Sequence, residues 1–268
     1  MKKKYKYIIG SGWYSSDDNN KRHVYGDDSI RSKGFQKIWF HSIEKYTTPV
    51  KIVITDSNSP VAPEFTQSDY IEIIKLNENG GHASNINGKY CGWLRSVICG
   101  LTFSLNCDCD YFVYVEQDCL LKGYGIIEKE IEKMNGDFAF GKSVDFSHPL
   151  QQSFFIIRRR AFERFLINLY SIQYSDYQMS CEIKFALASS FLFPVIPCSL
   201  FKLRGHGNLY RLFYFLQRTA AKALVKKKTT INIYGRDRPI DFDNDFFYFQ
   251  HGSKDEINNY LKHEGIDI

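Results

Sequence analysis

The stretch that decides the fold is Asp110-Tyr111-Phe112-Val113-Tyr114-Val115-Glu116-Gln117-Asp118. Its middle five residues are apolar throughout, as expected of a β-strand that is covered on both faces of a sheet. Two carboxylates follow the strand with one residue between them. Because side chains alternate along an extended backbone, Glu116 and Asp118 are predicted to face the same way. Such oxygen ligands suit Mg²⁺ or Mn²⁺, ions that often bind substrate phosphates, so the triplet is a candidate metal site.

Strand-like and helix-like segments alternate around this stretch. The apolar patterns predict strands over 5–10, 50–55, 70–76, 111–115, 138–141 and 153–157, and helices over 30–46, 87–105, 126–134, 161–169, 178–187, 209–225 and 254–261. Residues 11–28 are polar and rich in Gly, Asn and Asp, which predicts a loop. The alternation indicates an α/β fold with a doubly wound, mainly parallel sheet, whose ligands gather at the carboxyl ends of the strands.

The sequence also holds literal D-x-D triplets. Asp108 and Asp110 precede the strand, so they are predicted to lie at its amino end, away from a ligand cleft at the carboxyl end. Two later triplets, Asp241-Phe242-Asp243 and Asp243-Asn244-Asp245, lie in a segment without a clear pattern. They stay competitors of the Glu116-Gln117-Asp118 triplet.

The composition is that of a folded globular chain. The 268 residues are 44% hydrophobic and 16% aromatic, which argues against disorder. No apolar run approaches the ~20 residues that span a bilayer, and the apolar stretch after the lysine-rich start is too short for a signal peptide. The seven cysteines are odd in number and form no C-x-x-C pair, which disfavours structural zinc and a disulfide framework. We expect a cytoplasmic protein.

The positive charge is concentrated in one segment. Residues 201–238 hold ten Lys and Arg residues against one acid, Asp237, whereas the net charge of the chain is +5. Within this segment, residues 209–225 have an apolar helical face that ends in Lys226-Lys227-Lys228. This composition is typical of a helix that lies on an anionic membrane, here the inner face of the cytoplasmic membrane; a core-packed helix with a solvated basic end is equally consistent. No recognised nucleic-acid-binding motif is present, so we expect no nucleic-acid partner.

The order of these segments resembles that of bacterial GT-A glycosyltransferases, nucleotide-sugar-dependent enzymes of surface polysaccharide assembly. The resemblance covers roughly residues 1–190. Its pieces are a strand that ends in Asp56-Ser57-Asn58-Ser59, then Asn79-Gly80-Gly81, a helix that carries Arg95, and Glu116-Gln117-Asp118. The triplet is E-x-D where the family has D-x-D, which leaves open which carboxylate binds the metal directly.

The resemblance implies a GT-A (Rossmann-like) fold with a mixed, mainly parallel sheet and a helical C-terminal addition. Residues 1–200 would form the nucleotide-sugar-binding and catalytic core, and residues 201–268 a basic helical extension that completes the site and docks to the membrane. The implied donor is a nucleotide sugar, UDP-sugar first, bound with Mn²⁺ or Mg²⁺. The implied acceptor is a hydroxyl of a glycan or lipid-linked molecule in lipopolysaccharide or capsule synthesis, glycosylated with inversion; retention stays open.

The resemblance also implies roles for several residues around the donor. Asp56 would contact the nucleotide base or ribose, although an Asp in D-S-N-S-P is also typical of a turn. Arg95 would approach the diphosphate, or else lie on the helix surface. Arg236 and Arg238, in the turn-like Gly235-Arg236-Asp237-Arg238-Pro239, would clamp phosphates or be solvated.

Two further residues would complete the site. Glu182, on the helix that follows Arg158-Arg159-Arg160, would act as the general base toward the acceptor, with Asp176 as the alternative. The structural interpretation of Glu182 is an ion pair with Lys184 or Arg160. His251, after an aromatic run, would be a further metal ligand, and imidazole suits Mn²⁺ better than Mg²⁺.

Two other functions remain in competition. A sugar-phosphate nucleotidyltransferase would share the doubly wound sheet, but the first strand leads into Ser11-Gly12-Trp13-Tyr14 and not into a long Gly-rich loop bearing Arg or Lys. A non-catalytic carbohydrate- or membrane-binding module is the alternative outside the enzymes.

Overall fold

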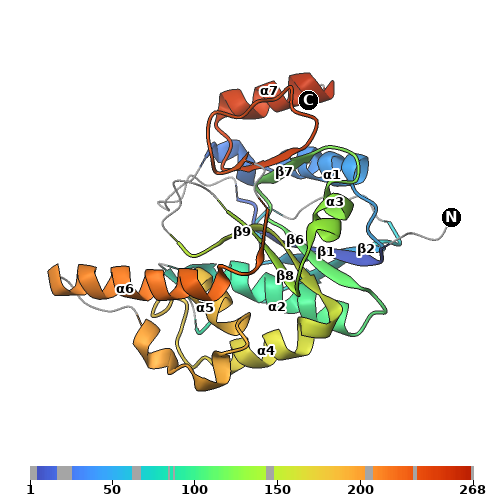
Figure 1. Cartoon of the computed structure of the whole chain (residues 1–268). Helices are drawn as coiled ribbons and strands as arrows, with labels where there is room; N and C mark the ends of the chain where they lie inside the picture. The colour runs from blue at the N-terminus through green and yellow to red at the C-terminus, as the bar shows by residue number, and fades with distance from the viewer. Residues whose placement is uncertain are drawn as a thin grey trace.

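The computed structural model describes residues 5–16, 26–61, 68–83, 85–86, 88–142, 148–202, 208–231 and 234–266. A seven-stranded sheet forms its centre, in the order β10-β8-β9-β6-β1-β2-β3 (Figure 1). Every strand runs parallel to its neighbours except β9, which is antiparallel to β6 and β8. The predicted α/β class with a mixed, mainly parallel sheet is confirmed. The strands are β1 (Tyr7–Trp13), β2 (Lys51–Asp56), β3 (Ile71–Lys75), β6 (Tyr111–Val115), β8 (Phe138–Gly141), β9 (Gln151–Arg158) and β10 (Thr229–Ile231).

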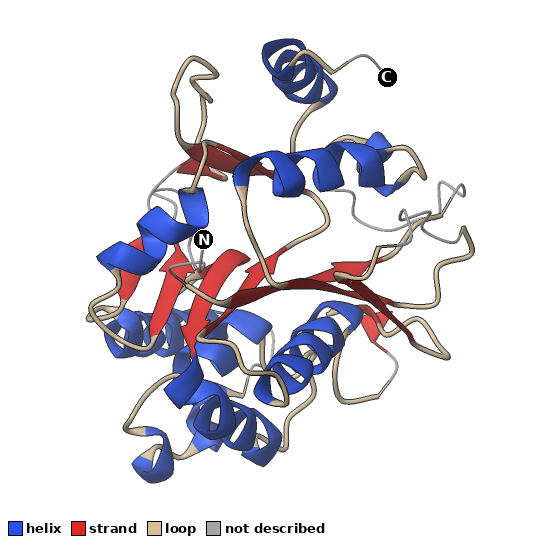
Figure 2. Ribbon diagram, turned by 90° about the vertical axis from the view of Figure 1, so that its right-hand side faces the viewer, coloured by secondary structure: helices blue, strands red, loops and turns tan. Residues whose placement is uncertain are grey.

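Helices cover both faces of this sheet (Figure 2). The strand β6 shows why: Val113 and Val115 contribute to the hydrophobic core on one face, and Phe112 and Tyr114 to the core on the other. The prediction of a strand covered on both sides is therefore confirmed. On the first face lie α1 (Phe35–Tyr46) and α3 (Ile126–Lys133), and α7 (Lys254–Glu264) extends the core of that side beyond the sheet; on the second lie α2 (Gly92–Leu105), α4 (Phe162–Ser171), α5 (Cys181–Ala188) and the end of α6 (Asn208–Val225).

A second, three-stranded sheet stands beside the central one, and the sequence patterns did not predict it. Its order is β11 (Tyr234–Gly235), β12 (Phe247–Gln250) and β7 (Cys119–Lys122). Strand β12 pairs with β7 in the antiparallel sense, so Gln250 lies opposite Cys119. The helix α7 covers this sheet and begins at the predicted capping box of Ser253 and Glu256. The late part of the chain is thereby fixed beside the Glu116-Gln117-Asp118 turn.

Several predicted boundaries are wrong. The helix predicted from residue 30 begins only at Phe35. The first strand extends through Ser11 and Gly12 to Trp13, where a loop is predicted. Small polar residues occur there because α2 packs closely: a Cβ at position 12 would lie 2.4 Å from the Ser96 hydroxyl. The helix predicted from residue 87 begins only at Gly92. The remaining short elements are β4 (Gly81–His82), β5 (Asn85–Ile86) and the 3₁₀ turns Asp28–Arg31, Arg159–Ala161, Phe193–Val195 and Cys198–Phe201.

Candidate functional site

A cavity of about 400 Å³ opens at the carboxyl ends of β1, β2 and β6. This is the edge at which parallel α/β sheets collect their ligands. Its walls come from the segment after β1, the turn after β2, the first turns of α2 and α5, the start of β9 and the C-terminal segment. Five of the eight predicted site residues line it: Glu116, Asp118, Glu182, Arg236 and His251.

The carboxylates of Glu116 and Asp118 converge on one side-chain amide. The Nε2 group of Gln250 donates to Glu116 Oε2 at 2.6 Å and to Asp118 Oδ1 at 3.1 Å. The backbone between them is a turn and not an extended strand, because the amide of Cys119 donates to the carbonyl of Glu116 at 2.9 Å. The predicted convergence is present, but strand alternation is the wrong reason for it.

The middle residue of the triplet, Gln117, faces away from the carboxylates and holds the turn in place. Its Oε1 accepts from the amide of Tyr14 at 2.9 Å, and its Nε2 donates to the carbonyls of Tyr14 and Ile30, both at 3.1 Å. The segments after β1 and before α1 are thus fixed against the triplet, and both line the cavity.

Gln250 is a site residue that sequence reasoning missed. It is buried at the end of β12, and the guanidinium of Arg236 donates to its Oε1 at 2.9 Å. This bond orients the amide so that its N–H groups face the two carboxylates. A polar residue at the end of an aromatic strand, next to the predicted ligand His251, is the signal that could have found it.

His251 completes this wall of the cavity. Its Nε2 lies 3.4 Å from Asp118 Oδ2. Its φ of 56° is in the left-handed region, which is unfavourable for a residue with a Cβ and recurs at functional positions. Burial lowers the pKa of His251 to about 4, although the neighbouring Asp118 opposes the shift. The imidazole is therefore neutral at pH 7, which is the form in which histidine binds metal ions.

The surroundings of Glu116 and Asp118 do not fully stabilise two negative charges. Burial and then the nearby Asp118 raise the pKa of Glu116 to about 8, against the opposing influence of Arg236 and Arg31. A cation would reverse this shift. Two carboxylates and a neutral imidazole are a donor set that fits Mn²⁺, and Mg²⁺ less well. In the structure their ligating atoms do not all lie within 4.8 Å of one another, and the N–H group of Gln250 stands between the carboxylates.

Glu182 approaches the cavity from the first turn of α5. Its Oε2 lies 3.8 Å from Nδ1 of His148, whose Nε2 lies 3.3 Å from the guanidinium of Arg218. Because a guanidinium only donates, Nε2 accepts and the proton of the neutral ring belongs on Nδ1, toward Glu182. Burial lowers the pKa of His148, while Glu182 raises it. The alternative that Glu182 pairs with Lys184 or Arg160 is wrong, since these bind Asp176 and Asp137.

Three predicted donor-binding residues are absent from the cavity lining. Asp56 accepts hydrogen bonds from the amide of Ser59 at 3.1 Å and from its hydroxyl, which closes the turn after β2. Arg95 donates to the carbonyl of Tyr90 at 3.0 Å and to Glu78 at 2.9 Å. Their roles toward a nucleotide stay predictions, and Asp56 acts in the structure through the turn that places Ser57 in the lining.

Arg238, the third of them, is held by the C-terminal segment. Its guanidinium lies 2.5 Å from Glu256 and donates to the carbonyl of Gln250 at 2.8 Å. It therefore supports the backbone that carries Gln250 and His251.

The competing D-x-D triplets lie elsewhere. The carboxylate of Asp110 accepts from the backbone amide of Lys6 at 3.1 Å, and Asp108 lies 3.2 Å from the Lys6 ammonium. This places them at the amino end of β6, as predicted. None of the three acids between 241 and 245 lines the cavity; Asp243 lies 3.8 Å from His263.

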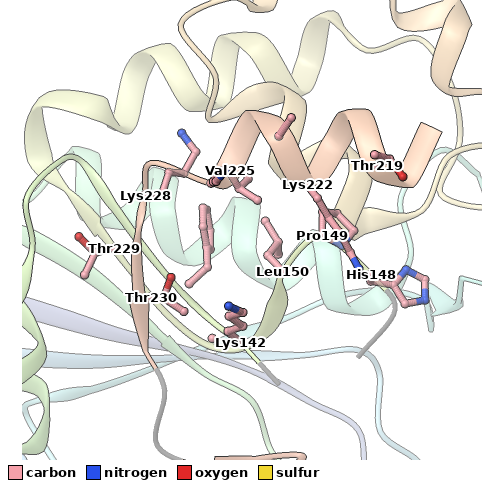
Figure 3. Close-up of a pocket in the computed structure, with 14 residues that line it drawn as sticks. Lys142, His148, Pro149, Leu150, Thr219, Lys222, Val225, Lys228, Thr229 and Thr230 are labelled. Atoms are coloured by element: carbon pink, nitrogen blue, oxygen red, sulfur yellow. The ribbon is translucent and has the colours of Figure 1, made fainter. Parts of the chain in front are cut away.

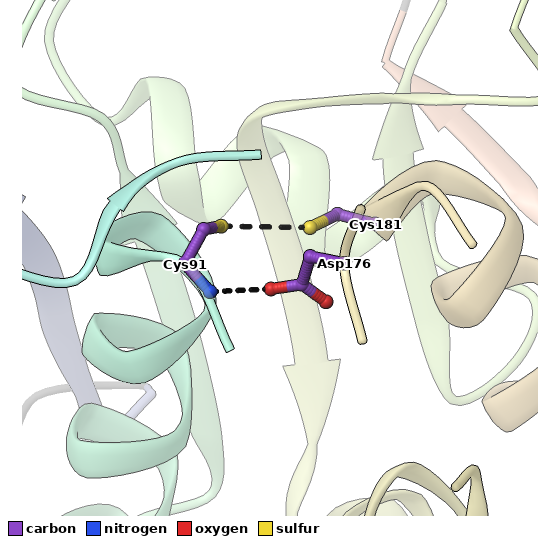
Figure 4. A group of neighbouring side chains, drawn as sticks. All are labelled: Cys91, Asp176 and Cys181. Carbon is purple, nitrogen blue, oxygen red and sulfur yellow. Dashed lines mark hydrogen bonds between the residues drawn. The ribbon is translucent and has the colours of Figure 1, made fainter. Parts of the chain in front are cut away.

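A second group of side chains of the kinds that bind metal ions lies next to the cavity (Figure 4). The ligating atoms of Cys91, Asp176 and Cys181 all lie within 4.8 Å of one another, and the two sulfurs are 3.7 Å apart. Both carboxylate oxygens of Asp176 are already engaged: one accepts from the amide of Cys91 at 2.5 Å, the other pairs with Lys184 at 2.5 Å. Both ion-pair partners are fully buried, and losing one partner of such a pair typically costs about 3–5 kcal/mol.

This group therefore ties the first turn of α2 to α5. The hydrogen bond to Cys91 and then burial raise the pKa of the Cys181 thiol well above its usual range, so the thiol stays protonated. A protonated thiol is a poor metal ligand, and the carboxylate is neutralised by Lys184. The same pairing occupies Asp176, the alternative general base.

Comparison with known proteins gives only distant likenesses. No family model and no curated protein matches the chain. Among solved structures, TarS 1–349 of S. aureus, a glycosyltransferase, matches with a TM-score of 0.43 and 10% identity. The match covers 96% of this chain but only 63% of the TarS chain. The inositol-1-phosphate CTP transferase of T. maritima has a TM-score of 0.45 and 10% identity over 98% of both chains. HddC of Yersinia pseudotuberculosis has a TM-score of 0.39 and 9% identity, covering 96% of this chain and 98% of that one. All three TM-scores are below 0.5, so these likenesses assign no activity to the chain.

Proposed function

We propose that this protein is a metal-dependent glycosyltransferase, which moves a sugar from a nucleotide-sugar donor to a hydroxyl of a glycan or lipid-linked acceptor. One observation carries the proposal. Glu116, Asp118 and His251 line a cavity that is also lined by the carboxylate of Glu182, which comes from helix α5. Such a cavity provides for both halves of the reaction, the departure of a diphosphate and the deprotonation of a hydroxyl.

The part of the cavity that these three residues line is the proposed site for Mn²⁺ or Mg²⁺. Glu116, Asp118 and His251 would hold the ion. A bound divalent ion supplies neutralisation of the charge that develops on the departing nucleoside diphosphate. Arg31 and Arg236 line the same cavity and add positive charge beside it.

The turn after β2 is the proposed place of the nucleotide. Ser57 and Asn79 line this end of the cavity, and the Ser57 hydroxyl accepts from the amide of Gly80 at 3.1 Å. The first turn of α2 lies beside them, and the positive end of its helix dipole favours a phosphate. Asp56 and Arg95 would support this part of the site from behind the lining.

The part of the lining formed by the start of β9 and the start of α5 suits a polyhydroxylated substrate. Three buried polar atoms that line it, Gln152 Nε2, Ser153 Oγ and Ser180 Oγ, have no hydrogen-bond partner among the described residues. Buried polar groups are rarely left unpaired unless water or a ligand satisfies them. The hydroxyl groups of a sugar offer both donors and acceptors to such atoms.

Glu182 would act as the base of a direct displacement. Its carboxylate accepts the proton of the acceptor hydroxyl as that oxygen bonds to the anomeric carbon. The bond from the anomeric carbon to the diphosphate oxygen breaks on the opposite face, so the configuration inverts. The proton on Nδ1 of His148 faces Glu182 and helps to keep its carboxylate oriented.

Donor turnover is the experiment that tests this function. The protein is incubated with radiolabelled UDP-, GDP-, CMP- or dTDP-sugar, with and without Mn²⁺. We expect Mn²⁺-dependent binding of one of them and its slow hydrolysis when no acceptor is present. Formation of nucleoside triphosphate from added pyrophosphate would instead identify a nucleotidyltransferase. Absence of Mn²⁺-dependent nucleotide binding in calorimetry would favour a non-catalytic binding module.

The surface of α6 supports association with an anionic membrane, where a lipid-linked acceptor of surface polysaccharide synthesis would lie. The helix projects from the body of the molecule (Figure 1). Leu212, Phe213, Phe215 and Leu216 are between 53% and 64% exposed, which disagrees with a core-packed helix over this part. Lys226 and Lys227 are exposed at its end, whereas Lys228 donates to the carbonyl of Ser189 at 2.7 Å. No helix in the described part of the chain is long and apolar enough to cross a bilayer.

Vesicle sedimentation tests this docking. Replacing Phe213 and Leu216 together by Ser should weaken binding to phosphatidylglycerol-rich vesicles by about tenfold or more, because each buried apolar side chain contributes about 1.5–3 kcal/mol. Tyr177→Ser, at a side chain that is 62% exposed outside α6, is the matched control. Equal sedimentation of the double variant and the wild type would refute the docking proposal.

A further inference from the structure

A second cavity, of about 460 Å³, lies between the C-terminal half of α6 and the edge of the central sheet (Figure 3). Four of the residues that line it are lysines, namely Lys142, Lys222, Lys226 and Lys228. Three threonines add hydroxyl groups, and among the described residues the lining includes no Asp or Glu. A concave surface with several ammonium groups and no carboxylate attracts an anion.

The fold brings these residues together from three elements. Lys142 follows β8, and Thr229 and Thr230 lie on β10, which pairs with β8 in parallel. Lys222 lies in the last turn of α6 and Lys226 follows the last residue of this helix, four residues later, so the two lysines are close in the chain. Like charges at this spacing repel each other, and an anion between α6 and the sheet removes the repulsion.

Lys228 is the best-fixed of the four lysines. Its ammonium donates to the carbonyl of Ser189 at 2.7 Å and lies 5.0 Å from the ring centroid of Phe138. Burial, and then the positive charge of Arg164, lower the pKa of Lys228 to about 8. The nearby Asp137 opposes this shift, and an anion bound in the cavity would act in the same direction as Asp137.

The lysine cavity adjoins the candidate active site. His148 lines both cavities, and its Nδ1 lies 3.8 Å from Glu182, the proposed base. A molecule whose hydroxyl reaches Glu182 therefore has the lysine cavity next to it, beyond His148. The direction is away from Glu116 and Asp118, which line only the first cavity.

We propose that the lysine cavity binds a phosphate group of the acceptor, so that this protein glycosylates a phosphate-bearing molecule. The inference rests on the proposed function, because it takes the occupant of the Glu182 side as an acceptor. A phosphate ester carries the charge and the acceptor oxygens that lysine and threonine side chains bind. The phosphate belongs either to a lipid-linked molecule or to a soluble phosphorylated glycan.

Binding of simple phosphate esters tests the proposal without any turnover. Glycerol 3-phosphate is titrated into the protein by calorimetry at low salt, without metal or donor. The variant that combines Lys142→Gln with Lys222→Gln should bind glycerol 3-phosphate at least about tenfold more weakly than the wild type, because it removes two charge-assisted contacts. The control combines Lys37→Gln with Lys262→Gln, which removes the same charge from exposed helix positions outside both cavities.

Unchanged affinity in the Lys142/Lys222 variant, or equal losses in the control, would overturn the proposal. Donor binding with Mn²⁺ is measured on the same samples and should not change. If no nucleotide sugar binds while glycerol 3-phosphate binding still depends on the lysines, the glycosyltransferase function fails and the anion site stands. A second arm uses dodecyl phosphate: binding at least about tenfold tighter than that of glycerol 3-phosphate assigns the phosphate to a lipid, and equal binding assigns it to a soluble glycan.

Discussion

Asp118→Asn should lower Mn²⁺-dependent turnover of the donor by about 10³-fold, since it removes one metal ligand and several kcal/mol of charge stabilisation with it. The substitution preserves the shape of the side chain, and its Oδ1 can still accept from Gln250, as Asp118 does at 3.1 Å. The fold should therefore survive. Calorimetric titration with Mn²⁺ and hydrolysis of radiolabelled donor measure the two effects on one sample.

The control for this prediction is built into the sequence. Asp108 belongs to a literal D-x-D triplet at the opposite edge of the sheet, where it lies 3.2 Å from the ammonium of Lys6 on the surface. Asp108→Asn removes the same charge and should leave both Mn²⁺ affinity and turnover unchanged. Wild-type turnover in Asp118→Asn, or an equal loss in Asp108→Asn, would remove the carboxylate turn from the site.

The pH dependence of Mn²⁺ binding gives this prediction a second readout. The pKa of Glu116 is raised to about 8, so its carboxyl group is protonated at pH 7 when no cation is bound. A metal ligand must be ionised, so Mn²⁺ has to displace this proton. Apparent affinity should rise with pH by about tenfold per unit up to pH 8 and then level off. In Asp118→Asn the levelling should move to lower pH, because the neighbouring negative charge that helps to raise the Glu116 pKa is gone.

The central sheet could be predicted from the sequence because its information is local. An uninterrupted apolar run such as 111–115 is sufficient to indicate a strand with both faces buried. The small sheet could not be predicted in the same way. Strand β12 has only four residues, and its partner β7 lies more than 120 residues earlier in the chain. Its pairing depends on the closed fold, and so does the position of Gln250 between Glu116 and Asp118.

The site residues also differ in how well the sequence predicts their positions. Glu116, Asp118, Glu182 and His251 follow strands or open a helix, and all four line the cavity. Asp56 ends a strand in the same way, but its carboxylate binds Ser59 and does not line the cavity. Arginines were harder to place, because a long side chain can reach several partners. Arg95 turns back to Tyr90 and Glu78, and Arg238 reaches Glu256. Sequence spacing does not show which of the nearby carboxylates and carbonyls an arginine will choose.

Glu182→Gln should lower kcat by about 10²–10⁴-fold, the range expected when a general base is lost, and leave donor affinity nearly unchanged. Glu182 comes from α5 and is not one of the proposed metal ligands, so its amide variant keeps the proposed metal and nucleotide contacts. The side chain is 22% exposed and forms no ion pair closer than the 3.8 Å approach of His148, so little stability should be lost.

A matched acid on the neighbouring helix separates catalysis from helix electrostatics. Glu163 occupies the first turn of α4 as Glu182 occupies the first turn of α5, but it is exposed and lies outside the cavity. Glu163→Gln loses the same favourable interaction with a helix N-terminus, about 0.3–1 kcal/mol, and should keep full kcat. If Glu182→Gln changes thermal stability more than kcat, or weakens donor binding as much as it slows turnover, Glu182 is not the base. With Asp176 held by Lys184, His148, whose Nδ1 lies 3.8 Å from Glu182, would then be the next candidate to accept the proton.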